Sequence, residues 1–328
     1  MKALITGGAG FIGSHLAEAL LARGDSVTVL DDLSTGRLEN LAHLDGHPHL
    51  RVVVGSILDE RLVDKLAEQT DVIYHLAAAV GVELIVKEPF KSLTTNIRGS
   101  EIVLEMAYRY QRKVLITSTS EIYGKNTSGP LDEEQDRILG SPLKTRWSYS
   151  IAKSVDEILA YLYWKKKGLP TVIVRLFNTV GPRQTGYYGM VIPRLVGQAL
   201  KGEPVTVYGT GKQSRCFLHV ADCVQALLAL IDHPKAVGTV FNIGGPEEIT
   251  IENLARRIIE LTKSPSRLVY VSYEQAYEDG FEDMQRRVPN TAKIERLTGF
   301  KVTRSLDQIL LDVIEDCRQR MERAAISA

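Results

Sequence analysis

The sequence has few cysteines, no excess of either charge and no long apolar run. Its three cysteines, Cys216, Cys223 and Cys317, match neither a disulfide framework nor the spacing of metal ligands. We therefore expect a reducing, cytoplasmic environment and no bound metal. Lysine plus arginine number 40 and aspartate plus glutamate also number 40, so the overall charge gives no reason to expect nucleic acid or an anionic membrane as a partner.

Signals for membranes and repeats are missing as well. No apolar stretch reaches the roughly 20 residues that a membrane-spanning helix needs. Met1 leads directly into a strand-like run, so no signal peptide is expected. The chain shows no internal repeat and no low-complexity segment. With 328 residues, it is long enough to bury a large core in one or two closely packed domains.

A glycine-rich turn stands between a strand and a helix at the start of the chain. Residues 2–6 form a short, mostly apolar run typical of a buried strand. Gly7, Gly10 and Gly13 follow, and apolar residues then recur at helical spacing. Such a turn lets the pyrophosphate of a dinucleotide approach the backbone at a helix N-terminus. Glycine-rich turns are common, so this pattern alone is weak evidence.

An acidic residue after the next strand strengthens this interpretation. Residues 26–30 predict a second strand, and Asp31 stands at its end. A carboxylate there can accept hydrogen bonds from both hydroxyls of the adenosine ribose, which favours NAD over NADP. The alternative is that Asp31 and Asp32 simply open a polar loop. The residues predicted to bind NAD are Gly7, Gly10, Phe11, Ile12, Gly13, Asp31, Asp32, Ser56, Ile57, Leu76, Ala77, Ala78, Thr117, Tyr149 and Lys153.

Strands and helices alternate through the first half of the chain. Further strands are predicted at 51–54, 72–76, 114–117 and 171–175, and helices at 59–69, 92–110 and 148–167. Alternation of this kind predicts an α/β fold, a Rossmann-type doubly wound parallel sheet with helices on both faces. Ligands bind such a sheet beyond the carboxyl ends of its strands.

After residue 180 the predicted segments become shorter and mixed. We interpret residues 1–180 as an NAD-binding domain, to which residues 216–243 are expected to return. Residues 181–215 and 244–328 are interpreted as a smaller mixed α/β cap that binds the substrate. No flexible linker separates the two parts, so the substrate is expected in the cleft between them.

A tyrosine and a lysine at i and i+4 are the first candidates for chemistry. Tyr149 and Lys153 lie on one face of a predicted helix. A nearby ammonium lowers the pKa of a phenol, so we expect Tyr149 to take a proton from a sugar hydroxyl while hydride leaves for NAD. The alternative is a surface pair without function.

A polar triplet follows the fifth predicted strand. Ser118 or Thr119 is placed to hydrogen-bond the hydroxyl that Tyr149 deprotonates. Simple oxidation does not need the carboxylate of Glu121, which suggests a second chemical step once a 4-keto sugar has formed. The alternative is that Thr119, Ser120 and Glu121 only cap a helix.

Together, these motifs resemble the extended short-chain dehydrogenases that act on nucleotide sugars. The resemblance covers nearly the whole chain and includes the glycine turn, Tyr149 with Lys153, and residues 175–183, 208–211 and 217–222. Finer features are similar to UDP-glucuronate decarboxylases, among them UDP-xylose synthases, UDP-apiose synthases and the decarboxylase of lipid A aminoarabinose synthesis. Those features are Thr119-Ser120-Glu121, Arg146-Trp147-Ser148-Tyr149, residues 212–217 and residues 280–289.

Two departures limit this resemblance. The Thr-Ser-Glu triplet also occurs in GDP-mannose 4,6-dehydratases, so it does not exclude dehydration. The chain also lacks the formyltransferase module that is fused to some lipid A enzymes, so that pathway is not implied.

The resemblance implies an NAD-dependent UDP-glucuronate decarboxylase. Oxidation at C4 would place a ketone β to the C5 carboxylate, which would leave as carbon dioxide and give UDP-4-keto-pentose or UDP-xylose. The implied catalytic residues are Thr119, Ser120, Glu121, Tyr149, Lys153 and Arg215. The implied substrate-binding residues are Asn178, Arg194, Tyr208, Arg215 and Arg287. A homodimer that pairs helices 92–110 and 149–167 is expected by analogy.

Three other functions stay open from the sequence. A UDP-sugar C4-epimerase would use Tyr149 and Lys153 alone, on UDP-glucose or UDP-glucuronate. A 4,6-dehydratase would use Glu121 as the base at C5. A non-catalytic NAD-binding regulator would keep only the fold, although the intact tyrosine–lysine pair argues against it.

Overall fold

The computed structural model of the protein describes residues 1–79, 88–141, 143–186, 190–276 and 282–327. A seven-stranded sheet forms its centre, in the order β3-β2-β1-β4-β5-β6-β11, and every neighbouring pair is parallel. Its strands are β1 (Lys2–Thr6), β2 (Ser26–Asp31), β3 (Leu50–Val54), β4 (Val72–His75), β5 (Lys113–Thr119), β6 (Thr171–Leu176) and β11 (Val240–Ile243). The predicted doubly wound sheet is confirmed.

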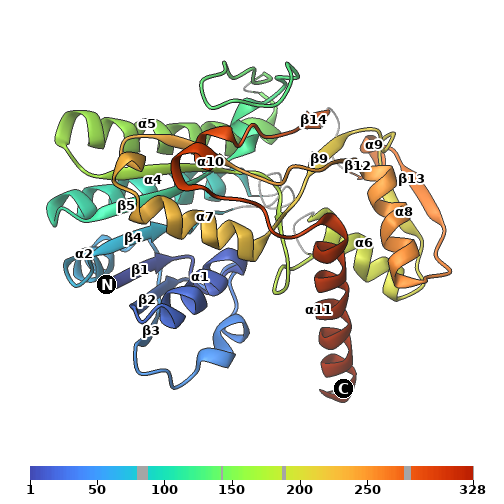
Figure 1. Cartoon of the computed structure of the whole chain (residues 1–328), viewed down its shortest axis with the longest axis horizontal. Helices are drawn as coiled ribbons and strands as arrows, with labels where there is room; N and C mark the ends of the chain where they lie inside the picture. Colours follow the sequence, from blue (N-terminus) through green and yellow to red (C-terminus); the bar gives the residue numbers. More distant parts are fainter. Residues whose placement is uncertain (80–87, 142, 187–189, 277–281, 328) are drawn as a thin grey trace.

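Helices cover both faces of this sheet (Figure 1). One apolar core lies between the sheet and helices α1 (Phe11–Ala22) and α7 (Val220–Asp232). A second core lies on the other face, beneath α2 (Glu60–Glu68), α4 (Pro89–Arg109) and α5 (Ser148–Lys167). Strands buried on both faces need apolar side chains at successive positions, which explains why β1, β4 and β5 are continuous apolar runs in the sequence.

Strand β1 lies between β2 and β4, where the strand order reverses. In an open α/β sheet this reversal creates a crevice for a ligand. Gly7 follows β1 with φ +73°, and a Cβ there would lie 2.7 Å from the backbone nitrogen of Ala77, which follows β4. Only glycine permits this turn and this close approach, so the residue type at position 7 follows from the fold.

The second half of the chain builds a further core at one side of the sheet. Helices α6 (Val191–Leu200), α8 (Ile251–Thr262) and α11 (Leu306–Ser327) pack there with β8 (Val205–Tyr208) and β13 (Leu268–Val271). A small sheet joins β12 (Glu248–Thr250), β9 (Ser214–Cys216) and β14 (Arg286–Arg287), and another pairs β10 (Leu218–His219) with β7 (Thr179–Val180). The short helix α9 (Tyr273–Ala276) also belongs to this half.

One element after β11 packs against the central sheet again. Helix α10 (Ala292–Thr298) packs against α7 and β11, and its Ile294 belongs to the core beneath α1 and α7. The described ranges contain the 3-10 helices η1 (Leu38–Leu44), η2 (Ser120–Tyr123), η3 (Thr145–Trp147) and η5 (Pro234–Ala236). The division into domains at residues 180, 215 and 243 stays a prediction.

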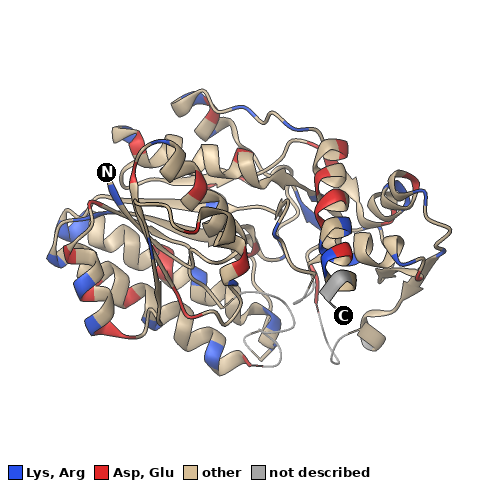
Figure 2. Ribbon diagram, turned by 90° about the horizontal axis from the view of Figure 1, so that it is seen from below, with Lys and Arg blue, Asp and Glu red and all other residues tan. Residues whose placement is uncertain are grey.

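Charge is distributed evenly over the molecule. Figure 2 shows acidic and basic residues interspersed on the helices around the sheet and on those of the second half. Within the described ranges, no helix combines the length and the apolar character that crossing a membrane would require. The same ranges contain no cluster of three or more His, Cys, Asp or Glu side chains that could hold a metal ion.

Candidate functional site

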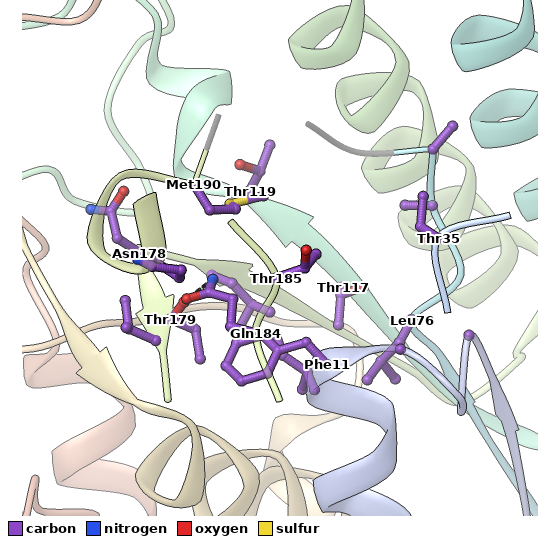
Figure 3. A pocket seen from close by; sticks show the side chains of 18 of the residues that line it. Phe11, Thr35, Leu76, Thr117, Thr119, Asn178, Thr179, Gln184, Thr185 and Met190 are labelled. Carbon is purple, nitrogen blue, oxygen red and sulfur yellow. Dashed lines mark hydrogen bonds between the residues drawn. The ribbon is translucent and has the colours of Figure 1, made fainter. Parts of the chain in front are cut away.

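A large cavity lies beyond the carboxyl ends of β1, β4, β5 and β6 and extends to α6 and β8. Its volume is about 1280 Å³, which is larger than a site for one drug-sized ligand. Figure 3 shows Phe11 at the start of α1, Leu76 after β4, and Thr117 and Thr119 on β5, with Asn178 from the segment after β6. The cavity therefore spans the sheet and the second half, with room for a dinucleotide and a nucleotide sugar together.

Most of the residues predicted for the site line this cavity. They are Gly7, Gly10, Phe11, Ile12, Gly13, Asp31, Asp32, Ile57, Leu76, Ala77, Ala78, Thr117, Thr119, Glu121, Tyr149, Asn178, Arg194, Tyr208, Arg215 and Arg287. Ser56, Ser120 and Lys153 are not among the lining residues. Ser120 contacts the lining residue Arg287, whereas Lys153 pairs with Asp156, which does not line the cavity.

The turn before α1 is shaped for a pyrophosphate. Gly10 is the N-cap of α1 and no side chain caps this helix, so its first N–H groups are free to meet phosphate oxygens. A Cβ on Gly13 would lie only 2.2 Å from the carbonyl oxygen of Gly7. The Asp31 carboxylate lies at the same end of the cavity and accepts hydrogen bonds from the N–H of Ala9 and of Leu33, each at 2.9 Å. These residues fit NAD.

We expect Gly13→Ala to abolish dinucleotide binding and to lower the melting temperature, because the new methyl group forces α1 away from the turn. Calorimetric titration with NAD and thermal unfolding would measure the two effects. Gly197→Ala is the matched control: it also lies in a helix, nothing lies within 4 Å of its Cβ position, and alanine there should stabilise the protein by about 0.5–1 kcal/mol. Equal NAD affinity in both variants would contradict the proposed turn.

The Tyr149 phenol lies at the cavity wall, and its surroundings do not favour the phenolate. Tyr149 is 7% exposed. Burial raises its pKa above the usual value, the charges of Glu121 and Asp156 raise it further, and Arg287 only partly opposes them. We expected Lys153 to lower this pKa. That expectation is wrong for the structure as it stands, because the Lys153 ammonium donates to Asp156 Oδ2 at 2.7 Å.

Glu121 is held between two guanidinium groups. Arg146 Nη1 donates to Glu121 Oε2 at 2.6 Å, and Arg287 Nη1 lies 3.7 Å from Glu121 Oε1. Burial alone would raise the pKa of Glu121, but the charges of Arg146 and Arg287 outweigh burial, and the pKa lies below its usual value. Glu121 is therefore a carboxylate at neutral pH. The sequence pointed to Arg146 only as part of the motif Arg146-Trp147-Ser148-Tyr149. That motif did not predict the ion pair between Arg146 and Glu121.

Arg287 also contacts the residue before Glu121. Its Nη2 donates to Ser120 Oγ at 2.5 Å. Burial lowers the pKa of Arg287 to about 10, and the neighbouring guanidinium groups of Arg215 and Arg146 contribute. Three arginines thus share one buried region with one glutamate and one aspartate, Glu121 and Asp283, which leaves an excess of positive charge. Such an excess favours an anionic substrate.

Arg215 pairs with the carboxylate of Asp283 and not with that of Glu121. Its Nη2 donates to both oxygens of Asp283 at 3.0 Å, and its Nη1 donates to the Ser214 carbonyl. The arginines closest to Glu121 are Arg146 and Arg287. The sequence offered Asp283 within its C-terminal pattern but gave no reason to pair it with Arg215.

The remaining substrate candidates lie toward the second half. Asn178 Nδ2 donates to the Cys216 carbonyl at 2.9 Å, which orients its amide at the cavity wall. The Arg194 guanidinium lies 4.2 Å from the centre of the Tyr208 ring, and both residues line the cavity. A flat aromatic ring backed by a guanidinium is suited to contact a planar base.

Glu282, the residue before Asp283, fixes this part of the chain to the sheet side of the cavity. Glu282 accepts hydrogen bonds from Lys144 and from Trp147 Nε1, the latter at 3.0 Å, and pairs with Lys125 at 2.7 Å. These contacts hold the C-terminal segment over η3 and the start of α5. Asp283 and Arg287 are thereby brought to the residues that follow β5.

Comparison with known proteins agrees with this site. The model of the NAD dependent epimerase/dehydratase family matches residues 3–244. The chain is 41% identical to UDP-N-acetyl-alpha-D-glucosaminuronate decarboxylase of Bacillus cytotoxicus, over 97% of this chain and 98% of that protein. It is 36% identical to UDP-glucuronic acid decarboxylase 1 of Xenopus tropicalis, over 99% of this chain and 74% of that protein.

A solved structure is also similar. UDP-glucuronic acid 4-epimerase of Bacillus cereus, in complex with UDP-glucuronic acid and NAD, has a TM-score of 0.88 and 29% identity, and the match covers 98% of this chain and all of that one. The family model covers well over half of the chain, and relatives above 30% identity extend along nearly all of it. The chain belongs to the NAD dependent epimerase/dehydratase family.

Proposed function

We propose that this protein is an NAD-dependent decarboxylase of a UDP-hexuronate, with UDP-glucuronate as its substrate. The observation that carries the proposal is the near full-length similarity to two decarboxylases of UDP-sugar acids. The site agrees chemically, because Glu121, Arg146 and Arg287 form an ion cluster next to Tyr149 that a simple C4 oxidation does not need.

In the first step, Tyr149 acts as the phenolate and takes the proton of the C4 hydroxyl. Bound NAD supplies the hydride acceptor for this oxidation. Thr119 and Ser118 line the cavity at the end of β5, and we infer that their hydroxyls hold the C4 oxygen. Among the described residues, Ser118 Oγ has no hydrogen-bond partner of its own, so it is free to donate to a substrate oxygen.

The second step breaks the bond between C5 and the carboxylate. The ketone at C4 is β to that carboxylate, so the bonding electrons pass into the C4 carbonyl as carbon dioxide leaves, and an enolate forms. Donors at the C4 oxygen stabilise the negative charge that develops there. Arg287 and Arg146 hold Glu121 ionised next to Tyr149. A proton from water then adds to C5, and the sugar is either released as the 4-keto pentose or reduced at C4 to UDP-xylose by return of the hydride removed in the first step.

A second substrate is favoured by a specific observation. The relative with 41% identity is named for UDP-N-acetylglucosaminuronate, which carries an acetamido group in place of the C2 hydroxyl. C2 is not one of the reacting carbons, so the same residues could perform the same steps on either sugar. UDP-N-acetylglucosaminuronate is therefore the second candidate substrate.

Incubation of the purified protein and NAD with each UDP-sugar acid tests these proposals. We expect carbon dioxide release and a pentose product by mass spectrometry from one or both sugars, and the ratio of kcat/KM values identifies the preferred one. A product of unchanged mass with inverted C4 would instead make the protein an epimerase, as the similarity to the Bacillus cereus enzyme allows. Loss of water from a neutral UDP-hexose would indicate a dehydratase.

We also infer that the protein is a homodimer that pairs through α4 and α5. These two helices pack side by side on one face of the sheet. Apolar side chains of α5 remain exposed on the single chain, among them Ile158 at 49%, Leu162 at 43% and Tyr161 at 38%. A second copy would cover this surface. Sedimentation equilibrium should give twice the mass of one chain.

A further inference from the structure

A buried ion pair lies behind the proposed base and has no part in the steps above. Lys153 Nζ donates to Asp156 Oδ2 at 2.7 Å, and the two side chains are 2% and 0% exposed. Neither residue lines the cavity. Within the described ranges, the other carboxylate oxygen, Asp156 Oδ1, accepts no hydrogen bond. Placing a carboxylate in such surroundings carries a desolvation cost, which the charge of its partner must offset.

Asp156 lies on the same helix face as the proposed base. Tyr149, Lys153 and Asp156 stand at i, i+4 and i+7 of α5, a spacing that places all three in one row. We propose that Asp156 is a positioning residue for the reaction: it fixes the Lys153 ammonium from behind, and its negative charge opposes the loss of a proton from the Tyr149–Lys153 pair. The inference rests on the proposed function, because it takes Tyr149 to be the base.

Other charges also face this pair. Glu121 from η2 opposes the Tyr149 phenolate as Asp156 does, and Arg287 from β14 favours it. Arg146 acts through Glu121, which it pairs with. His75 from β4 is close to Lys153, but burial, with a contribution from the Lys153 charge, lowers its pKa to about 3. His75 is therefore neutral near pH 7, and Asp156 is the anion in direct contact with Lys153.

The direction of the effect does not depend on which group of the pair gives up the proton. Tyr149 and Lys153 stand at i and i+4 of α5, where side chains are neighbours, so the protonation of one group affects that of the other. Loss of one proton gives either a phenolate beside an ammonium or a phenol beside an amine, and both forms are more negative by one charge than the starting pair. A fixed negative charge on Asp156 disfavours both. Its removal should let the proton leave at a lower pH.

The test is the pH profile of kcat in Asp156→Asn, measured on the NAD-bound enzyme with the UDP-sugar acid that the wild-type protein turns over. We expect the acidic limb to move to lower pH by about one unit, so that on this limb the rate relative to the plateau rises about tenfold. Asp156→Glu keeps the charge and should keep the wild-type profile. An unmoved limb in Asp156→Asn, or the same shift in Asp156→Glu, would overturn the proposal.

Glu157→Gln is the matched control on the same helix. Glu157 is buried like Asp156, but it binds Arg175 through two hydrogen bonds of 3.0 and 2.9 Å. This variant should lose thermal stability without a shift of the acidic limb. If Asp156→Asn does not fold, Asp156→Ser, which leaves room for water at Lys153, is measured against the same expectation.

A direct titration separates failure of this inference from failure of the proposed function. The holoenzyme is labelled with ¹³C at the tyrosine ring carbon that bears the hydroxyl, and Tyr149→Phe identifies the NMR signal of Tyr149. This signal should begin to titrate at lower pH in Asp156→Asn than in the wild type, whether or not any sugar is turned over. Absence of turnover with every UDP-sugar would reject the proposed function, whereas identical titrations would reject the role of Asp156.

Discussion

Replacement of Tyr149 by phenylalanine should lower turnover of the UDP-sugar acid by roughly a hundred- to ten-thousand-fold, the range over which a positioned acid–base group contributes. The substitution removes one oxygen from the cavity wall and leaves the ring packed as before. Single-turnover experiments with excess enzyme should show that formation of reduced nicotinamide and release of carbon dioxide fall together, since both follow the loss of the C4 proton.

Tyr163→Phe is the appropriate comparison for this variant. Tyr163 belongs to the same helix, and its ring packs edge-on against Tyr108 rather than at the cavity. The Tyr163→Phe variant also loses one phenolic oxygen, and its turnover rate should equal that of the wild type. Near-normal reduction of NAD by Tyr149→Phe would mean that a different group takes the C4 proton, and the role assigned to the tyrosine–lysine motif would be wrong.

The fold could be predicted from local patterns because its main elements are defined locally. A strand buried on both faces must be apolar along its length, and an amphipathic helix must repeat its apolar positions every three or four residues. β5 and α5 satisfy these conditions within their own sequences. Gly7 is predictable for the same reason, since the tight turn after β1 admits no side chain.

The partners of the charged residues were less predictable, because they come from distant parts of the chain. The Glu121–Arg146 pair joins residues 25 positions apart, and the Arg215–Asp283 pair joins residues 68 positions apart. Sequence patterns identified each of these regions but could not match their side chains. Such pairs depend on how η2, η3 and the C-terminal segment pack, which is a property of the whole fold.

The partner of Lys153 could not be predicted for a different reason, because its position on the helix allows two partners. A lysine on a helix reaches side chains at both i−4 and i+3, which here are Tyr149 and Asp156. The i and i+4 spacing directed attention to the tyrosine. Electrostatics favours the aspartate, because a buried ammonium gains more from a full opposite charge than from a neutral phenol. The structure places Lys153 Nζ on Asp156.

Glu121 is the residue on which the distinction between oxidation and decarboxylation depends. Its carboxylate balances Arg146 and Arg287 in a region where the side chains of all three are at most 13% exposed. Glu121→Gln keeps the shape of the side chain but leaves two guanidinium groups without this counter-charge. Removal of one partner from a buried ion pair typically costs about 3–5 kcal/mol of stability, so the variant must first be shown to fold, by thermal unfolding and NAD binding.

The two chemical steps should respond unequally to Glu121→Gln. C4 oxidation depends on Tyr149, and loss of the Glu121 charge makes the phenolate easier to form, so single-turnover reduction of NAD should be preserved or slightly faster. Carbon dioxide release should slow by about a hundredfold, because the two guanidinium groups, no longer neutralised, hold the departing carboxylate in its anionic form. The 4-keto acid with its carboxylate intact should then accumulate and be visible by mass spectrometry. If both steps slow by the same factor, Glu121 serves substrate binding or the first step, and the decarboxylation must be explained by other residues.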